Sequence, residues 1–237
     1  MAGLLVSVRS PEEAVAAVVG GALVIDVKDP ARGPLGRADP ETWRAVRRVV
    51  PASIPVSVAL GEIGEGRSIP AGSFEGIAFR KLGLAGAGPN WIEEWAEARR
   101  RLDGPAAWVA VAYSDWRIAG SPGPDEVLSA ALEAPDCSGV LVDTWSKARP
   151  GWRDGLESWA DWVARARLGG RFVALAGGLD LATIERLAPL GPDLFAVRGA
   201  ACTGSDRTAA IDPRRVAALV AVAARAGVGR ALKSRDL

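Results

Sequence analysis

Eight short apolar segments of β-strand character recur along the 237-residue chain, and helix-like segments separate most of them. They occupy residues 4–8, 23–27, 54–58, 76–79, 108–112, 139–143, 172–176 and 194–197. Strands that are apolar throughout and alternate with helices form parallel sheets with both faces covered. Eight such units in a chain of this length favour a closed (β/α)8 barrel over an open doubly wound sheet.

The segments between and after the predicted strands have helical character. They cover residues 11–20, 40–50, 90–102, 124–134, 153–168, 180–188 and 213–227. Ser10, Asp39 and Asp212 each precede a proline at the start of a segment, which is typical of a helix N-terminus. The loop 62–72 is too rich in glycine to predict a helix. No linker interrupts the pattern, so we expect an α/β protein with a single (β/α)8 TIM-barrel domain over residues 1–237.

Histidine is absent from the chain, and this absence restricts its chemistry. The commonest general base and zinc ligand is missing, as is any Ser-His-Asp or Cys-His arrangement. Proton transfers in an enzyme of this sequence would use Lys, Asp, Glu, Tyr or Cys. The two cysteines, Cys137 and Cys202, form neither a disulfide framework nor a metal-binding pattern. We therefore expect no metal and no other cofactor.

The formal net charge of +1 argues against a nucleic-acid or membrane-surface partner, which usually requires a basic patch. The N-terminal residues lack the basic start and the long apolar run of a signal peptide. The alanine-rich stretch 216–224 is too short to span a bilayer. We expect a cytoplasmic protein that acts on a small molecule, and the sequence leaves its oligomeric state open, a homo-oligomer included.

Lysine is rare in this chain, which has 25 arginines and only 4 lysines. Three of them, Lys28, Lys81 and Lys147, come after the second, fourth and sixth predicted strands. The carboxyl ends of barrel strands form one mouth, so we expect the three amines to share a site. A buried lysine, unlike an arginine, can lose its proton and attack a carbonyl carbon. The alternative is that all three are ordinary surface lysines near loops.

Two acidic residues belong to the same predicted mouth. Asp26 precedes Lys28 by two residues, so both side chains share one face of their strand. Asp143 ends the sixth predicted strand. Either carboxylate can move protons or set the protonation state of a lysine, and the alternative role is a helix cap or an ion pair with arginine. The cluster of lysines would also attract an anionic substrate, such as a phosphate ester.

Two glycine-containing loops follow the seventh and eighth predicted strands. Their sequences are ALAGGLD (174–180) and VRGAACTGSDR (197–207). In barrels of this type these loops often bind phosphate through backbone N–H groups, because glycine lets an anion approach the main chain. The expected phosphate-binding residues are Gly177, Gly178, Arg198, Gly199 and Ala200. Arg198 and Arg207 would each either add positive charge or support the structure.

The chain resembles the (5-formylfuran-3-yl)methyl phosphate synthase family in six motifs along essentially its whole length. The motifs are LLVSVRSPEEA, IDVKDPARGPLG, FRKLGLAG, VLVDTWSK, ALAGGL and FAVRGAACTGSDRTAAID. The resemblance implies a (β/α)8 barrel that condenses two molecules of glyceraldehyde 3-phosphate into a furan aldehyde phosphate, a precursor of methanofuran-type cofactors. It also implies that Lys28 forms a Schiff base and that Lys81, Asp143 and Lys147 are acid/base groups.

Other functions fit the same residues. A Schiff-base aldolase or a phosphosugar isomerase would use a similar cluster of lysines and acids in the same fold. A phosphosugar-binding barrel without catalytic activity would need only the cationic mouth and the glycine-containing loops. Formation of a covalent adduct on Lys28 and of a furan product separates these alternatives from a synthase.

Overall fold

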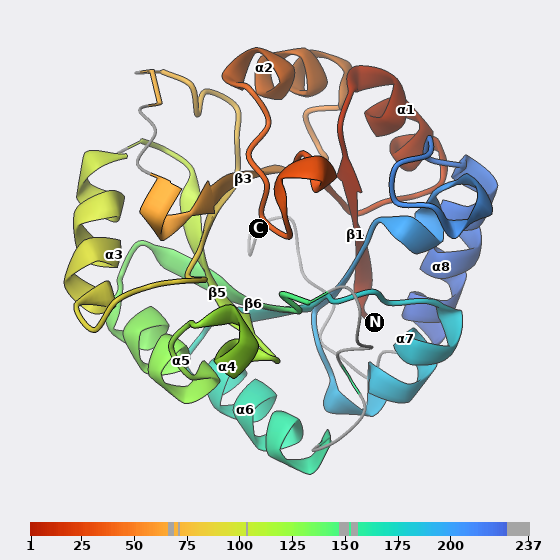
Figure 1. The fold of residues 1–237 in the computed structure, drawn as a ribbon. Helices are drawn as coiled ribbons and strands as arrows, with labels where there is room; N and C mark the ends of the chain where they lie inside the picture. Colours follow the sequence, from red (N-terminus) through yellow and green to blue (C-terminus); the bar gives the residue numbers. More distant parts are fainter. Residues whose placement is uncertain (66–68, 71, 103, 147–151, 153–155, 227–237) are drawn as a thin grey trace.

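The computed structural model describes residues 1–65, 69–70, 72–102, 104–146, 152 and 156–226. Eight parallel strands close into a barrel in sequence order, and β1 pairs with β8 to complete it (Figure 1). They are β1 (Gly3–Val8), β2 (Val24–Val27), β3 (Val56–Glu62), β4 (Phe79–Gly83), β5 (Ala107–Tyr113), β6 (Cys137–Asp143), β7 (Phe172–Leu175) and β8 (Leu194–Val197). This architecture confirms the predicted (β/α)8 barrel.

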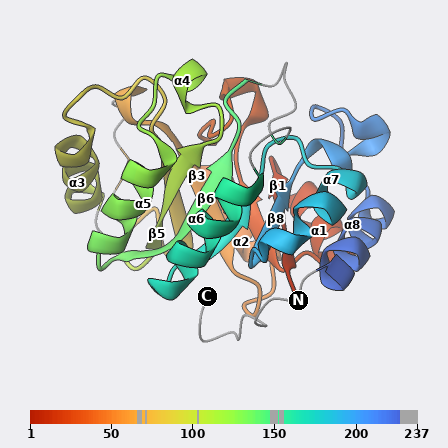
Figure 2. The same ribbon diagram turned by 90° about the horizontal axis from the view of Figure 1, so that it is seen from below.

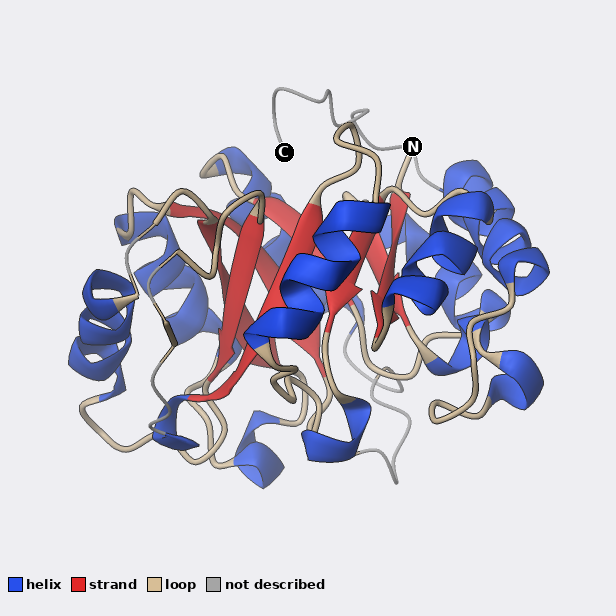
Figure 3. Ribbon diagram, turned by 90° about the horizontal axis from the view of Figure 1, so that it is seen from above, coloured by secondary structure: helices blue, strands red, loops and turns tan. Residues whose placement is uncertain are grey.

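A layer of helices surrounds the strands, as the views across the barrel show (Figures 2 and 3). The α-helices are α1 (Pro11–Val19), α2 (Pro40–Val49), α3 (Trp91–Arg101), α4 (Trp116–Ala119), α5 (Pro124–Glu133), α6 (Leu156–Leu168), α7 (Leu181–Leu187) and α8 (Pro213–Ala226). Short 3₁₀ turns are η1 (Pro30–Arg32), η2 (Ile63–Glu65), η3 (Ala188–Leu190), η4 (Gly199–Ala201) and η5 (Thr203–Ser205). In the described part of loop 62–72, only η2 is helical, in keeping with its glycine content. No described helix has the length and apolar character needed to cross a membrane.

Alternate strand residues build two separate apolar cores, one inside the barrel and one between the strands and the helices. Side chains two positions apart on a strand point to the same face. The interior rows therefore continue from apolar to polar residues as each strand nears its carboxyl end. Ser7, Asp26, Lys81 and Asp143 follow the buried interior residues Leu5, Val24, Phe79 and Leu141. The alternation of residues along the strands thus places polar side chains at the mouth of the barrel.

The fourth strand differs from its prediction, which placed it at residues 76–79. The strand runs from Phe79 to Gly83, so it includes the charged pair Arg80 and Lys81. Arg80 points to the helix side, where its guanidinium lies over the rings of Phe74 and Trp108, 4.9 and 4.6 Å from their centroids. These aromatic contacts allow a cation to be buried within a strand. As a consequence, Lys81 lies inside the barrel and not in the loop that follows the strand.

Candidate active site

A cavity of about 620 Å³ opens at the carboxyl ends of the strands. Its wall includes Ser7, Asp26, Lys28, Lys81, Asp143, Gly177, Gly178, Arg198, Gly199, Ala200 and Arg207. The structure therefore brings nearly all the predicted site residues to one cavity. The exception is Lys147, which lies outside the described residues.

A buried ion pair lies on the wall of this cavity. The Nζ atom of Lys81 donates to Oδ1 of Asp26 at 2.6 Å, and their side chains are only 4% and 2% exposed. The hydroxyl of Ser7 donates to the other oxygen of Asp26 at 3.1 Å, which fixes the carboxylate. The pair links β2 to β4, and its short contact is within the range that supports direct proton transfer.

Lys28 directly follows β2 and is held by the loop that comes after it. Its Nζ atom donates to the backbone carbonyl of Pro34 at 3.0 Å. The loop closes on itself where the N–H of Asp29 donates to the carbonyl of Gly36. A Cβ atom at Gly36 would lie 2.1 Å from the carbonyl oxygen of Asp29, so this closure requires glycine. The Pro/Gly-rich loop thus positions the Lys28 amine at the cavity wall.

Asp143 ends β6 and is buried at the cavity wall, with 3% of its surface exposed. Its Oδ1 atom accepts from the backbone N–H of Thr144 at 2.7 Å. Thr144 in turn packs against Gly177 in the loop after β7. A Cβ atom at Gly177 would come within 2.6 Å of the Thr144 methyl group, and Gly177 has a φ of +100°. Glycine at this position therefore lets the two loops approach each other closely.

The loops after β7 and β8 present backbone N–H groups at the cavity. Gly178, like Gly177, has a positive φ, at +69°. Among the hydrogen bonds formed by the described residues, none uses the N–H groups of Gly177, Gly178, Gly199 or Ala200. Successive main-chain N–H groups without protein acceptors are suited to binding an anion.

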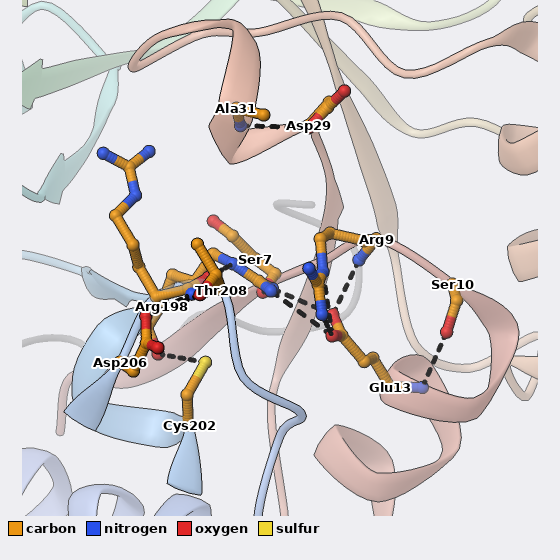
Figure 4. Close-up of polar contacts among 11 residues, drawn as sticks. Ser7, Arg9, Ser10, Glu13, Asp29, Ala31, Arg198, Cys202, Asp206 and Thr208 are labelled. Carbon is orange, nitrogen blue, oxygen red and sulfur yellow. Dashed lines mark hydrogen bonds and ion pairs between the residues drawn. The ribbon is translucent and has the colours of Figure 1, made fainter. Parts of the chain in front are cut away.

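Arg198 belongs to a buried network behind the β8 loop (Figure 4). Its Nη1 atom donates to the carbonyl of Ser7 at 2.8 Å and to Oε2 of Glu13 at 2.9 Å. Its Nε atom donates to the carbonyl of Arg207 at 2.7 Å. Arg9, which precedes α1, donates to the same glutamate through its Nε and Nη2 atoms. Burial acts to raise the pKa of Glu13, but the hydrogen bonds from Arg198 and Arg9 outweigh it and hold the pKa below its ordinary value.

Sequence reasoning missed a second polar pair, the partly buried Glu62 and the buried Tyr113. The Tyr113 hydroxyl donates to Oε1 of Glu62 at 2.7 Å, and the backbone N–H of Ala85 donates to Oε2 at 2.9 Å. Burial raises the pKa of Glu62, although both hydrogen bonds act against the rise. Burial, and the nearby carboxylate of Glu62, raise the pKa of Tyr113 well above its ordinary value.

Two sequence signals were available for this pair. Tyr113 is the single tyrosine of the chain, and it follows a predicted strand. Gly83, two positions after Lys81, leaves space for the acid, because a Cβ atom there would lie 2.0 Å from Oε2 of Glu62. Glu13 was also missed, since the sequence Ser10-Pro11-Glu12-Glu13 predicts only the start of a helix. Across the described residues, no three or more His, Cys, Asp and Glu side chains are grouped to hold a metal ion.

A closed barrel with a polar cavity at the carboxyl ends of its strands defines the class of (β/α)8-barrel proteins. A phosphoribosylanthranilate isomerase in complex with a reduced phosphoribulose derivative has the same fold, with a TM-score of 0.63 and 14% identity; the alignment covers 95% of this chain and 100% of that one. The 3-hexulose-6-phosphate synthase of Salmonella typhimurium gives a TM-score of 0.56 at 18% identity, over 94% and 99% of the two chains. At these identities the likeness concerns the fold alone.

Sequence comparison narrows this class to one family. Residues 4–220 match the family model described as 4-HFC-P synthase. A relative from Methylorubrum extorquens is 37% identical over 92% of this chain and 89% of its own length. The (5-formylfuran-3-yl)methyl phosphate synthase of Methanopyrus kandleri is 36% identical over 86% and 91% of the two chains. The chain belongs to the (5-formylfuran-3-yl)methyl phosphate synthase family, which confirms the resemblance inferred from its motifs.

Proposed function

We propose that this protein condenses two molecules of glyceraldehyde 3-phosphate into (5-formylfuran-3-yl)methyl phosphate through a Schiff base on Lys28. The family supports the product, a precursor of methanofuran-type cofactors. The observation that carries the mechanism is the presence of Lys28 and the buried Asp26–Lys81 pair on one cavity. Because one phosphate leaves by elimination, the enzyme would be a carbon–oxygen lyase acting on phosphates.

The proposed reaction begins with isomerisation of both triose phosphates toward the ketone, with Lys81, Asp143 and Lys147 as the acid/base groups, and the first of them then reacts with Lys28. The Lys28 amine then attacks the ketone carbon and water leaves, which gives an iminium that accepts electrons from the adjacent carbon. Loss of a proton from the hydroxymethyl carbon gives an enamine, which expels phosphate from the other neighbouring carbon. The CH2 end of the resulting enamine attacks the ketone carbon of the second triose phosphate. The free hydroxyl of the second triose then attacks the iminium carbon and closes the ring, the Lys28 amine leaves, and loss of a second water gives the aromatic furan, whose stability drives the last steps.

The geometry supports distinct proposed tasks within this scheme. Lys81 and Asp26 exchange protons across their 2.6 Å contact, while Ser7 holds the carboxylate in place. The Pro34 carbonyl holds the Lys28 amine at the cavity wall, ready for attack. Asp143 lines the same cavity, accepts a hydrogen bond from the N–H of Thr144 and would serve as a further acid/base group.

The loops after β7 and β8 would bind a substrate phosphate in this scheme. Gly177, Gly178, Gly199 and Ala200 would supply backbone N–H groups, and Arg198 lines the same cavity. Binding the phosphate there would orient the carbonyl carbon toward the lysines. A single domain over residues 1–237, a cytoplasmic location and a reaction without added metal or cofactor stay predictions.

The deciding experiment incubates the purified protein with glyceraldehyde 3-phosphate alone and identifies the product by mass and furan absorbance. We expect (5-formylfuran-3-yl)methyl phosphate and inorganic phosphate. Borohydride reduction during turnover should leave a substrate adduct on Lys28, located by peptide mass analysis. A six-carbon product without furan absorbance would indicate an aldolase, dihydroxyacetone phosphate alone an isomerase, and unchanged substrate a binding protein. Each of these three results would overturn the proposal.

A further inference from the structure

The Arg198 guanidinium is occupied by protein acceptors although Arg198 lines the cavity. Its Nε atom donates to the carbonyl of Arg207, its Nη1 atom to Ser7 and Glu13, and its Nη2 atom to Glu13 at 3.3 Å. The side chain is only 5% exposed. A guanidinium bonded in this way on all three nitrogens fixes the protein groups around it, because its planar fork holds each acceptor in a set direction.

The network around Glu13 joins three separate parts of the barrel. Arg198 ties the loop after β8 to the end of β1 through Ser7, and Glu13 ties both to α1. Arg9 completes it, since its backbone N–H and its guanidinium both donate to Glu13. Two arginines surround one glutamate, so the network keeps an excess of positive charge next to the cavity.

Arg207 is the cation that this network places at the cavity. Its carbonyl accepts from Arg198, while its own side chain extends in the other direction and its Nη2 atom donates to the carbonyl of Pro30 at 2.9 Å. Pro30 lies two residues after Lys28. That bond is the one hydrogen bond its side chain makes among the described residues, which leaves the Nε and Nη1 groups for a ligand.

The turn that carries Arg207 has the strained backbone typical of a functional loop. Ser205 has a φ of +60° and is the one described residue other than glycine with a positive φ. Arg215 on α8 holds the turn through two hydrogen bonds. Its Nε atom donates to the carbonyl of Ala200 and its Nη2 atom donates to the hydroxyl of Ser205. The carbonyl of Ser205 also packs close to Gly199, at 3.3 Å from where a Cβ atom would lie.

We propose that Arg207 binds the substrate phosphate directly and that the Glu13–Arg198 pair is a positioning unit that holds Arg207 and the N–H groups of Gly199 and Ala200. The proposal deepens the proposed function, on which it rests, and names Arg207 and not Arg198 as the side chain that contacts the phosphate. An arginine that bridges to the Lys28 loop also sets the distance between the bound phosphate and the reacting amine.

Inorganic phosphate is the probe, titrated calorimetrically into the intact protein and its variants. Arg207→Gln should weaken phosphate binding by roughly tenfold to a hundredfold, because it removes a charge-assisted hydrogen bond. Arg207→Lys keeps the charge and should recover part of the affinity. Arg165→Gln is the matched control, because Arg165 is an exposed α6 arginine whose partners are Asp125 and Asp161, and it should bind phosphate as the wild type does.

The positioning role is tested by a double-variant cycle. Glu13→Gln should weaken phosphate binding several-fold, and it should weaken it much less in a chain that already carries Arg207→Gln. In furan formation both variants should raise the KM for glyceraldehyde 3-phosphate more than they lower kcat, which a general loss of folded protein would not produce. Glu13→Asp, which retains the charge, serves as the second variant where Glu13→Gln does not fold.

Two results would overturn the proposal. One is a wild-type phosphate affinity in Arg207→Gln. The other is additivity, in the free energy of phosphate binding, of the Glu13 and Arg207 substitutions. Failure of the proposed function is distinguishable, since phosphate binding is measured without any turnover. If phosphate binding depends on Arg207 but the protein forms no furan, the role of Arg207 stands and the proposed synthase activity is wrong. If the protein forms furan but phosphate binding does not change in Arg207→Gln, the synthase activity stands and the role of Arg207 is wrong.

Discussion

Two buried ion pairs lie at the mouth of the barrel, and they are built differently. Asp26 and Lys81 meet through one contact of 2.6 Å on the cavity wall. Glu13 and Arg198 meet through two contacts, and the arginine also binds two backbone carbonyls. The first pair joins two interior strand residues, and the second joins loops and a helix behind the wall.

The difference teaches what each pair can contribute. Lysine can give up its proton, and aspartate can take one, so a single short contact facing a cavity suits proton transfer. Arginine stays charged, and its fork holds several acceptors at fixed angles, so the second pair suits the positioning of loops. The chain uses arginine for nearly all its cations, and the lysines that it keeps at the mouth are the cations able to do chemistry.

The strongest test of this division replaces the proposed nucleophile by a cation that cannot form a Schiff base. Lys28→Arg keeps the charge but should reduce furan formation by about a thousandfold or more, as loss of a covalent catalyst does. Initial rates followed by furan absorbance measure the loss, and circular dichroism shows that the fold is kept. A wild-type rate in Lys28→Arg would show that Lys28 does not form the Schiff base.

The second test compares loss of one charge of the Asp26–Lys81 pair with loss of both charges. Asp26→Asn leaves the Lys81 ammonium buried without its carboxylate, and the free energy of unfolding should fall by about 3–5 kcal/mol. Asp26→Asn combined with Lys81→Met removes both charges and should recover most of that stability while activity stays lost. Urea unfolding of the three proteins measures both effects. Equal stability of the single variant and the wild type would show that the pair contributes no net stability.

Much of this division was visible in the sequence, because rare lysines stood near strand ends in a chain rich in arginine. The position of Lys81 within its strand was missed, since two adjacent charged residues look like a loop until Phe74 and Trp108 are seen to cover Arg80. The partner of Arg198 was also beyond sequence reasoning. Glu13 lies 185 residues away, and only closure of the barrel brings the two together.

Glu62 was missed because the third strand, predicted at 54–58, extends to Glu62, which the sequence places in the glycine-rich loop 62–72. A second, physical reason adds to this. The register of β3 against β4 shifts between Ala59 and Glu62, so simple alternation along the strand gives the wrong face for the residues after the irregularity. The shift places the Glu62 carboxylate over Gly83 and within reach of Tyr113. Tyr113 and Gly83 could have drawn attention to this region, but a β-bulge has no reliable sequence signature, so their proximity to Glu62 was not predictable.

A third test uses acid to examine the Glu13–Arg198 pair. Because the folded pKa of Glu13 is held below its ordinary value, its carboxylate stabilises the fold above the ordinary pKa of about 4.3, and this stability is lost as pH falls through the folded pKa. Glu13→Gln should cost about 2–3 kcal/mol at pH 7, from the lost charged hydrogen bonds. The gap between wild type and variant should narrow in acid. Urea unfolding at a series of pH values measures it, and a constant gap would contradict the assignment.

The smallest expected effect concerns the pair that belongs to neither group, Glu62 and Tyr113. Tyr113→Phe removes the donor to Glu62 Oε1 and should cost about 1 kcal/mol of unfolding free energy, since one partly buried acceptor loses its partner. The hydrogen bond from Tyr113 lowers the pKa of Glu62, so this pKa should rise further in the variant, as followed by carboxyl NMR. Trp145→Phe is a suitable control, because Trp145 packs edge-on against the Tyr113 ring without touching the hydrogen bond. Loss of furan formation with little loss of stability would move this pair from a structural role into the group of residues that handle protons.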